Sequence, residues 1–202
     1  MFRKSPIQRN VNSFNNKMDI FSILPHSSGK VFFTGDSITE YVEWQEIFDN
    51  PDFRKRAMSG CGVEHVLEIM ENFIVPAKPI KIFVLAGINN IQAGDSGEKI
   101  INAFKKICRT VHDQIPETKL YLQSILPVNT LLYKKSIRKF FPLMKIPEAG
   151  EIERINESIS LLCSHYENIE FIDLWQFLVT NNQLSEEYTI DGLHLNGEGV
   201  NA

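Results

Sequence analysis

Short strand-like segments alternate with longer helix-like segments along this chain from residue 30 onward. The strand-like segments are mostly β-branched or aromatic, and each ends near a glycine, a proline or a polar turn. Their ranges are 30–34, 54–58, 80–86, 120–126 and 169–174. Strands joined by helices through short linkers favour a parallel sheet with helices on both faces. We therefore predict an α/β fold, a three-layer α/β/α flavodoxin-like sandwich with a five-stranded parallel sheet, in which the polar segment 54–58 forms an edge strand.

Apolar residues recur at helical spacing in three of the segments between the strands. These segments cover residues 63–73, 100–115 and 152–166. Asp95 followed by Glu98 has the pattern of a capping pair and predicts the start of the second helix. Pro116 predicts its end.

The beginning of the chain has a different composition. Four basic residues and several asparagines precede the first acid, Asp19. A secretory signal would need an apolar region of about 7–15 residues, which residues 1–18 lack, and a transit peptide is the less favoured alternative. We expect a mobile polar tail over residues 1–18 and one domain over residues 19–202.

Composition excludes several classes of function. A net charge of −4 gives no basic surplus for nucleic acid. No apolar run approaches the roughly 20 residues that cross a bilayer, so stable membrane insertion is not expected. Cys61, Cys108 and Cys163 are too few and too scattered for a disulfide framework or a zinc site. We therefore expect free thiols, no metal, no cofactor and a cytoplasmic setting, and no feature specifies an oligomeric state.

Residue types that can take part in catalysis follow the first three predicted strands. Ser37 lies in a Gly-Asp-Ser turn after the first strand, Gly60 in a Ser-Gly turn after the second, and Asn89 in a Gly-Ile-Asn turn after the third. Each turn alone is typical of ordinary loop structure. Ligands of open α/β sheets bind beyond the carboxyl ends of the strands, so one pocket would gather all three.

A carboxylate and an imidazole stand close together near the end of the sequence. Asp191 and His194 are three residues apart in a glycine-containing turn, so both side chains can face the same way. The carboxylate can accept from one ring nitrogen and leave the other free to take a proton from Ser37. Together with the Gly60 and Asn89 turns, this set predicts acyl transfer by a serine nucleophile.

These blocks, in this order, resemble the SGNH (GDSL-type) hydrolase superfamily from about Asp19 to the end of the chain. The resemblance implies a three-layer α/β/α fold and metal-free ester hydrolysis. Ser37 would be the nucleophile, His194 its base and Asp191 the group that orients the base. The backbone N–H groups of Ser37 and Gly60 and the side-chain amide of Asn89 would form the oxyanion hole.

Glu43-Trp44 and the segment 121–129 are similar to a bacterial subgroup of acyl hydrolases or sialate O-acetylesterase-like proteins. Other positions depart from the family pattern. Cys61 stands where a carboxylate is usual, and Asn90 stands where Asp is common, which predicts weaker support for neighbouring loops. Relatives usually continue into a terminal helix, whereas eight residues follow His194 here, which predicts exposed apolar surface or a looser His194 loop.

The function predicted from the sequence is hydrolysis of small acyl esters through an acyl-enzyme, with O-acetyl groups on a carbohydrate as the expected substrate. The alternatives are a lysophospholipase or thioesterase, and a carbohydrate- or lipid-binding module with an idle triad. The segment 133–145 carries five cations and no acid, interleaved with aromatic residues. It predicts either a lid that favours anionic substrates or a lipid surface, or a solvated loop with its aromatic residues tucked into the core.

Overall fold

Five strands pair in parallel in a computed structural model that describes residues 6–25 and 28–202. They are β1 (Val31–Gly35), β2 (Phe53–Ala57), β3 (Lys81–Leu85), β4 (Lys119–Gln123) and β5 (Ile169–Ile172). Their order is β2-β1-β3-β4-β5, which places the polar strand β2 at an edge, as predicted. This is the flavodoxin-like order, with its topological switch point between β1 and β3.

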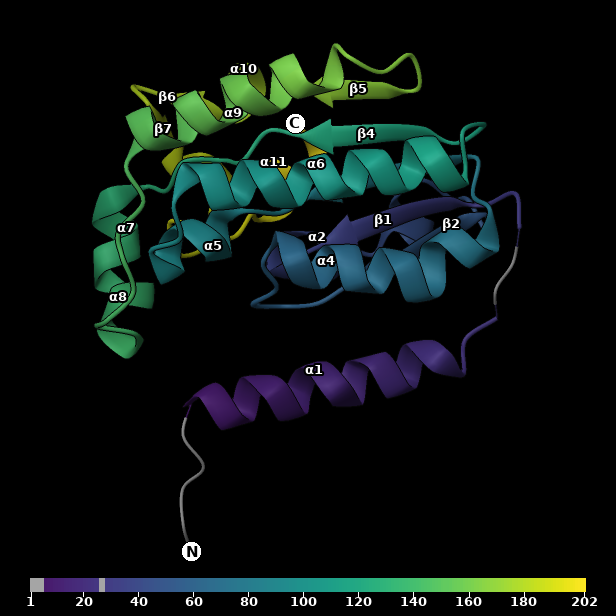
Figure 1. Cartoon of the computed structure of the whole chain (residues 1–202). Coiled ribbons are helices and arrows are strands. Elements are labelled where there is room, and N and C mark those ends of the chain that lie inside the picture. Colours follow the sequence, from purple (N-terminus) through teal and green to yellow (C-terminus); the bar gives the residue numbers. More distant parts are fainter. Residues whose placement is uncertain (1–5, 26–27) are drawn as a thin grey trace, which may run out of the picture.

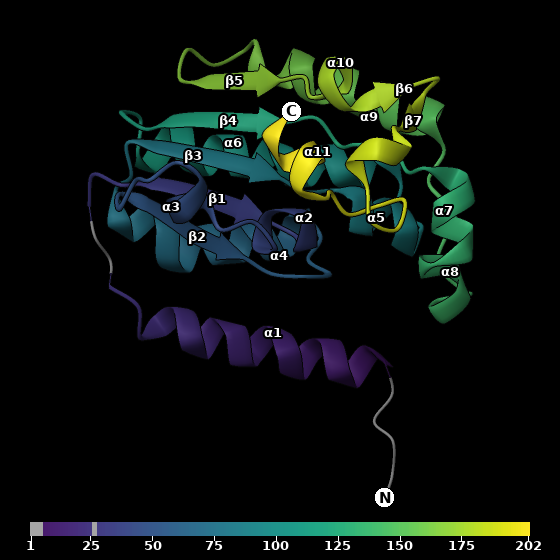
Figure 2. The same ribbon diagram turned by 180° about the vertical axis from the view of Figure 1, so that it is seen from behind.

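Helices cover the sheet on both sides. On one face lie α4 (Val63–Ile69), α6 (Gly97–Gln114) and α9 (Ala149–Cys163), with α6 packed against both of the others (Figure 1). The short helices α3 (Trp44–Ile47) and α11 (Gly197–Asn201) lie on the other face (Figure 2). The predicted three-layer α/β/α fold with a five-stranded parallel sheet is thereby confirmed.

The remaining elements are short and stand mostly at the ends of strands. They are α2 (Ser37–Glu40), α5 (Ile88–Ala93), α7 (Thr130–Lys135), α8 (Ile137–Phe140), α10 (Trp175–Leu178), the hairpin strands β6 (Val179–Thr180) and β7 (Gln183–Leu184), and a 3₁₀ turn at Glu186–Tyr188. The helical segment predicted over 63–73 continues past α4 as a π-helical turn at Met70–Ile74 and a 3₁₀ turn at Val75–Ala77.

The start of α6 differs from the sequence prediction. Ser96 is the N-cap, and its hydroxyl accepts from the Lys99 N–H at 3.2 Å. Asp95, which we had predicted to pair with Glu98, binds the Lys99 ammonium and the Asn90 amide instead. Serine and aspartate are equally good caps, so their neighbours decide which one is used. The helix ends at Gln114, two residues before Pro116, as expected.

Residues 6–22 form helix α1 (Pro6–Ser22), where the sequence predicted a mobile polar tail over residues 1–18. Residues 1–5 of that segment lie outside the described residues. Phe14, Met18 and Phe21 follow one another at helical spacing and pack against the core, with Phe21 only 4% exposed. The Phe21 ring meets Phe73 edge-on at 5.8 Å. This apolar helix face was not identified from the sequence because most of the residues around it are polar.

The three cysteines are free and buried, as predicted. Burial raises the pKa values of Cys61 and Cys108 to about 12 and of Cys163 to about 11, so all three thiols stay protonated at neutral pH. Within residues 6–25 and 28–202, no helix is long and apolar enough to cross a membrane. The same part of the chain holds no cluster of three His, Cys, Asp or Glu side chains with the spacing of a metal site.

Candidate active site

Ser37 begins helix α2 directly beyond the carboxyl end of β1. Asp36 is the N-cap of this helix, and its carboxylate accepts from the Ile38 N–H at 3.0 Å. Gly35 precedes the turn at a φ of 156°, and a β-carbon there would collide with the Leu85 carbonyl oxygen of β3. Glycine is therefore needed to bring β1 and β3 together at the switch point, and this approach fixes the position of Ser37.

The loop that carries Asp191 and His194 is held tightly from within. Asp191 Oδ1 accepts from the Leu193 N–H at 3.0 Å and from the His194 N–H at 2.9 Å. Thr189 accepts from the Gly192 N–H at 2.9 Å and donates to the His194 carbonyl at 2.8 Å. The loop therefore has a defined shape that does not depend on a ligand.

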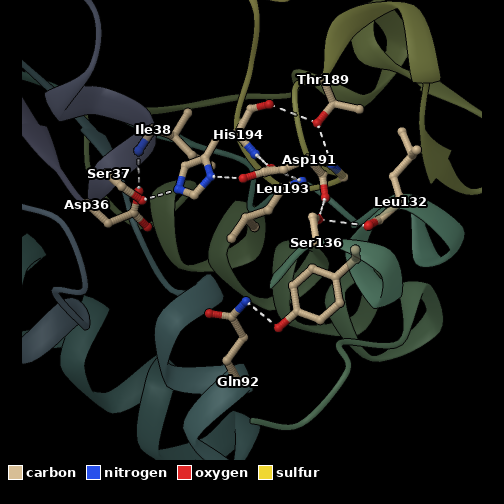
Figure 3. A network of polar contacts seen from close by, with 12 residues as sticks. Asp36, Ser37, Ile38, Gln92, Leu132, Ser136, Thr189, Asp191, Leu193 and His194 are labelled. Atoms are coloured by element: carbon tan, nitrogen blue, oxygen red, sulfur yellow. Dashed lines mark hydrogen bonds and ion pairs between the residues drawn. The ribbon is translucent and has the colours of Figure 1, made fainter. Parts of the chain in front are cut away.

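The same loop also rests against α7. Gly192 has a φ of 90°, and a β-carbon there would strike the backbone of Asn129 and Tyr133. The Asn129 N–H donates to the Gly192 carbonyl at 2.8 Å, and the Ser136 hydroxyl lies 2.5 Å from the Asp191 carbonyl oxygen (Figure 3). Contacts from both ends of α7 thus fix the position of the loop relative to the sheet.

Ser37, His194 and Asp191 meet in one continuous chain of hydrogen bonds. Ser37 Oγ lies 2.8 Å from His194 Nε2, and His194 Nδ1 lies 2.7 Å from Asp191 Oδ2 (Figure 3). Although 157 residues separate Ser37 from His194, the sequence prediction that these side chains converge agrees with this geometry. With Asp191 accepting from Nδ1–H, Nε2 is free to receive the serine proton.

Burial alone would raise the pKa of Asp191. The hydrogen bonds from the His194 ring and from the His194 and Leu193 N–H groups outweigh burial and lower the pKa below its ordinary value. The carboxylate is therefore ionised at neutral pH and can stabilise a proton on His194.

Gly60 and Asn89 stand on the two neighbouring loops. Gly60 has a φ of 79° and is exposed, and Asn89 is half-buried near the start of α5. The Asn89 amide donates to the Cys61 carbonyl at 3.0 Å, which ties the two loops together and leaves the second amide hydrogen available. Within the described residues, the N–H groups of Ser37 and Gly60 donate to no acceptor.

Asn90 supports these loops strongly, which corrects the expectation drawn from its replacement of Asp. Its side chain is 4% exposed and accepts from the Val63 N–H at 2.9 Å. Its amide donates to Glu64 at 2.9 Å and to Asp95 at 2.8 Å. An aspartate could not donate to two carboxylates, so the amide suits these neighbours. Cys61, the other departure, is a buried and protonated wall residue.

Glu40 is a site-associated residue that the sequence prediction missed. Its carboxylate accepts from both the N–H and the hydroxyl of Ser59, at 2.7 and 2.6 Å, and binds the Lys17 ammonium of α1 at 2.6 Å. It thus connects α1, α2 and the loop that contains Gly60. The available signal was an acidic residue three positions after Ser37 in a helix whose other members are buried.

A pocket of about 540 Å³ opens beside His194. Its walls are mainly apolar and come from α2, α3 and the end of the chain, including Ile38, Tyr41, Val42 and Ile190. The Tyr41 ring lies 5.2 Å from the His194 ring and is 62% exposed. A small organic molecule could therefore approach the serine–histidine pair from this side.

Residues 33–202 match the family model of the GDSL-like lipase/acylhydrolase family. The match covers most of the chain, so this protein belongs to that family, and the resemblance noted from the sequence is confirmed. Membership implies hydrolase activity of the esterase or acylhydrolase type. The fold and the serine–histidine–aspartate contact are those such an activity requires.

Individual relatives are more distant. The N-acylneuraminate cytidylyltransferase of Streptococcus agalactiae is 26% identical over 179 residues, which is 88% of this chain and 38% of that protein. The chain thus spans about two fifths of that curated relative. The platelet-activating factor acetylhydrolase IB subunit alpha2 of Gallus gallus is 24% identical over 157 residues, covering 73% of this chain and 67% of that protein. A solved structure described as a platelet activating factor from Streptococcus pneumonia has a TM-score of 0.80 at 28% identity and covers 96% of this chain and 88% of that one.

Proposed function

We propose that this chain is a serine ester hydrolase that removes small acyl groups, with an O-acetylated acidic sugar as substrate. The observation that carries the proposal is the unbroken contact from Ser37 Oγ through the His194 ring to Asp191, at 2.8 and 2.7 Å. Membership of the GDSL-like family supports the reaction class. The reducing compartment that suits three free thiols supports the cytoplasm as its location.

In the proposed reaction, Ser37 Oγ attacks the ester carbonyl carbon while its proton moves to His194 Nε2. The carbonyl electron pair moves onto oxygen, where the N–H groups of Ser37 and Gly60 and the Asn89 amide stabilise it. The intermediate collapses and breaks the bond to the alcohol oxygen, which takes the proton from Nε2. Water then attacks the acyl-enzyme by the same route and releases the acid and the free Ser37 hydroxyl.

The three oxyanion donors are supported by their bonding. The N–H groups of Ser37 and Gly60 make no internal hydrogen bond in the described part of the chain, and Asn89 has an amide hydrogen to spare. Removing one such donor in other hydrolases costs on the order of 3 kcal/mol. Asn89→Ala is therefore expected to lower kcat about a hundredfold with little change in KM, measured with a p-nitrophenyl ester. Undiminished kcat would remove Asn89 from the oxyanion hole.

Two relatives support the choice of substrate. One is named as an acetylhydrolase, and the other is a cytidylyltransferase of N-acylneuraminate, an acidic sugar. An acetyl ester of such a sugar combines both properties. Release of acetate from O-acetylated N-acylneuraminate should exceed release from a neutral acetylated sugar, as measured by acetate assay. Equal rates would contradict the preference for an acidic sugar.

The decisive test of the reaction class is labelling of the serine. A fluorophosphonate should label the protein at Ser37, and Ser37→Ala should lose both labelling and ester turnover while keeping the same thermal unfolding midpoint. Ser158→Ala serves as a matched control because Ser158 is an exposed serine of α9 whose hydroxyl donates to the Arg154 carbonyl at 2.9 Å, and it lies outside the proposed triad and oxyanion hole. Labelling that persists in Ser37→Ala would contradict the proposal.

The apolar pocket beside His194 favours a second candidate, a lysophospholipase or thioesterase that accepts longer acyl chains. A p-nitrophenyl ester series from acetate to octanoate separates the two candidates. If kcat/KM falls as the chain lengthens, the acetylesterase proposal stands. If it rises by about tenfold or more, as burial of several methylene groups predicts, the second candidate replaces it.

A further inference from the structure

Helices α7 and α8, with the segment that follows them to residue 145, form an arm at the edge of the molecule (Figures 1 and 2). One side of this arm is anchored. Tyr133 is fully buried with its hydroxyl bound to Gln92 at 2.9 Å, and Ile137 packs against the core. The predicted alternative of a solvated loop with its aromatic residues tucked into the core holds for Tyr133 alone, because Phe140 and Phe141 are exposed. The alternative of a lid or a lipid surface stays a prediction.

The outward side exposes large apolar side chains. Leu143 is 99% exposed and Phe140 is 74% exposed. Leu131 and Phe141 are also exposed, at 62% and 49%. Isolated exposed apolar residues are ordinary, but these four residues, here the apolar patch, lie within thirteen residues of one arm, and their exposure to water is unfavourable.

Unpaired lysines accompany this apolar patch. Lys134, Lys135 and Lys139 are exposed, and their ammonium groups form no hydrogen bond or ion pair with the described residues. The other two cations of the segment are occupied, since Arg138 binds the Met144 carbonyl and Lys145 binds Glu151. Residues 133–145 carry +5 in a chain of net charge −4, so the remainder of the chain carries −9. The arm therefore carries a net positive charge although the chain as a whole is acidic.

We propose that the α7–α8 arm docks the protein on an anionic lipid surface, with Phe140 and Leu143 inserted at the headgroup level and the three free lysines facing the lipid phosphates. Lysines beside exposed aromatic and aliphatic residues are the composition of interfacial helices. Protein–protein interfaces are depleted in lysine and enriched in arginine, and all three free cations here are lysines. A soluble acidic sugar would leave Phe140 and Leu143 in water.

The arm is also connected to the candidate active site. Ser136, between the exposed lysines, contacts the Asp191 carbonyl (Figure 3), and Asn129 at the base of the arm binds Gly192. A protein docked through this arm would therefore hold the Asp191–His194 loop near the lipid surface. The docking itself requires no ester hydrolysis and is testable on the inactive protein.

The test is sedimentation of the full chain with vesicles of phosphatidylcholine, with and without phosphatidylglycerol, using both the unmodified chain and Ser37→Ala. Both proteins should bind the vesicles that contain phosphatidylglycerol, and added salt should weaken the binding. Lys134→Gln/Lys135→Gln/Lys139→Gln should lower the partition coefficient about a hundredfold, since each lysine near an anionic surface contributes about a fivefold change. Phe140→Ser/Leu143→Ser should lower it at least tenfold.

Matched controls come from surfaces away from the arm. The triple variant Lys105→Gln/Lys106→Gln/Arg109→Gln removes three exposed cations of α6. The single variant Leu161→Ser removes an apolar residue that is 66% exposed. Both controls should bind vesicles as the unmodified chain does. Equal losses in the control and arm variants would show that only net charge or bulk hydrophobicity matters, and would overturn the proposal.

A different partner bound at the arm, in place of a lipid surface, would give different results. A concentration-dependent dimer in size-exclusion chromatography that the arm variants abolish would assign the patch to a second copy. Unchanged vesicle binding, combined with slower turnover of an acidic acetyl ester in the lysine variant, would assign it to substrate recognition. Either result overturns lipid docking. Because Ser37→Ala is measured in parallel, failure of the esterase proposal leaves this test intact.

Discussion

Two aspartates lie beside the two partners of the Ser37–His194 contact, and their pKa values move in opposite directions (Figure 3). Burial raises the pKa of Asp36 to about 7, opposed by the hydrogen bond from the Ile38 N–H, by the charge of His194 and by the N–H of Asp36 itself. Asp191 has a lowered pKa because three hydrogen bonds outweigh its burial. One Asp36 oxygen is buried with no hydrogen-bond partner among the described residues.

The difference shows that burial and hydrogen bonding together, more than distance from the reacting atoms, determine which carboxylate is ionised. Both residues lie within the same small region, but only Asp191 has a donor for each oxygen. A site that needs one permanent negative charge next to an imidazole can place it on Asp191. Asp36 instead caps α2 and sets the backbone of Ser37.

The largest expected effect on activity follows from replacing Asp191, the aspartate that is fully hydrogen-bonded. Asp191→Asn keeps the size of the side chain but presents an amide to His194 Nδ1, which favours the tautomer with a proton on Nε2. That proton blocks acceptance from Ser37, so kcat should fall by about 10³–10⁴, as in other serine hydrolases with the same change. Steady-state kinetics with a p-nitrophenyl ester measures this. A loss below tenfold would mean that Asp191 does not orient the base.

Asp36, which has one oxygen without a hydrogen-bond partner among the described residues, should respond differently to the same substitution. Asp36→Asn keeps the acceptor for the Ile38 N–H and removes a charge that burial disfavours. The pKa of Asp36 rises from 3.8 to about 7 on folding, so protonated Asp36 favours the folded state by about 4 kcal/mol. This contribution is complete below pH 3.8 and is lost as the pH rises through 7. The stability of the variant relative to the unmodified protein should therefore increase between pH 4 and pH 8.

Urea unfolding at pH 4, 6 and 8 measures that change, with Asp113→Asn as a control at an exposed aspartate of α6. The kcat/KM of Asp36→Asn should fall less than tenfold at pH 8, in contrast with Asp191→Asn. Equal losses of activity in the two variants would erase the distinction between the aspartates. A stability difference that does not vary with pH would contradict the raised pKa.

Much of this arrangement was predictable because it follows from topology. Parallel strands place their carboxyl ends along one edge, so Ser37 and Asn89, which follow β1 and β3, had to lie near each other at the switch point. The three-residue spacing of Asp191 and His194 makes their contact local. Only the meeting of Ser37 with His194 required a long-range inference.

The supporting contacts were not predictable for a related reason. Ser136, Asn90 and Glu40 act through bonds to backbone or side chains far along the chain, and nothing in their local sequence indicates those partners. Helix α1 was missed because three apolar residues among many polar ones give a weak pattern until a surface is available to pack against. Local sequence indicates what a residue can bind, and the fold determines what it does bind.

Glu40 sharpens the comparison as a third carboxylate, and the smallest effect is expected there. Burial alone would raise the pKa of Glu40, but hydrogen bonds from Lys17 and Ser59 lower it below the ordinary value, so this residue resembles Asp191. A lowered folded pKa gives stability that is present above the ordinary value of 4.5 and is lost as the pH falls through the folded value. Glu40→Gln should therefore destabilise the protein by about 1–2 kcal/mol at pH 7 and by less at pH 4.

The effect of Glu40→Gln on catalysis should pass through the loop that contains Gly60. Glu40 holds Ser59 by two hydrogen bonds, and a looser loop would place the Gly60 N–H less accurately at the oxyanion, lowering kcat about three- to tenfold with little change in KM. Lys17→Met removes the α1 partner but leaves both Ser59 bonds, so its kcat should stay close to that of the unmodified protein. If Lys17→Met lowers kcat as much as Glu40→Gln does, the effect arises from the packing of α1, and the positioning role of Glu40 is wrong.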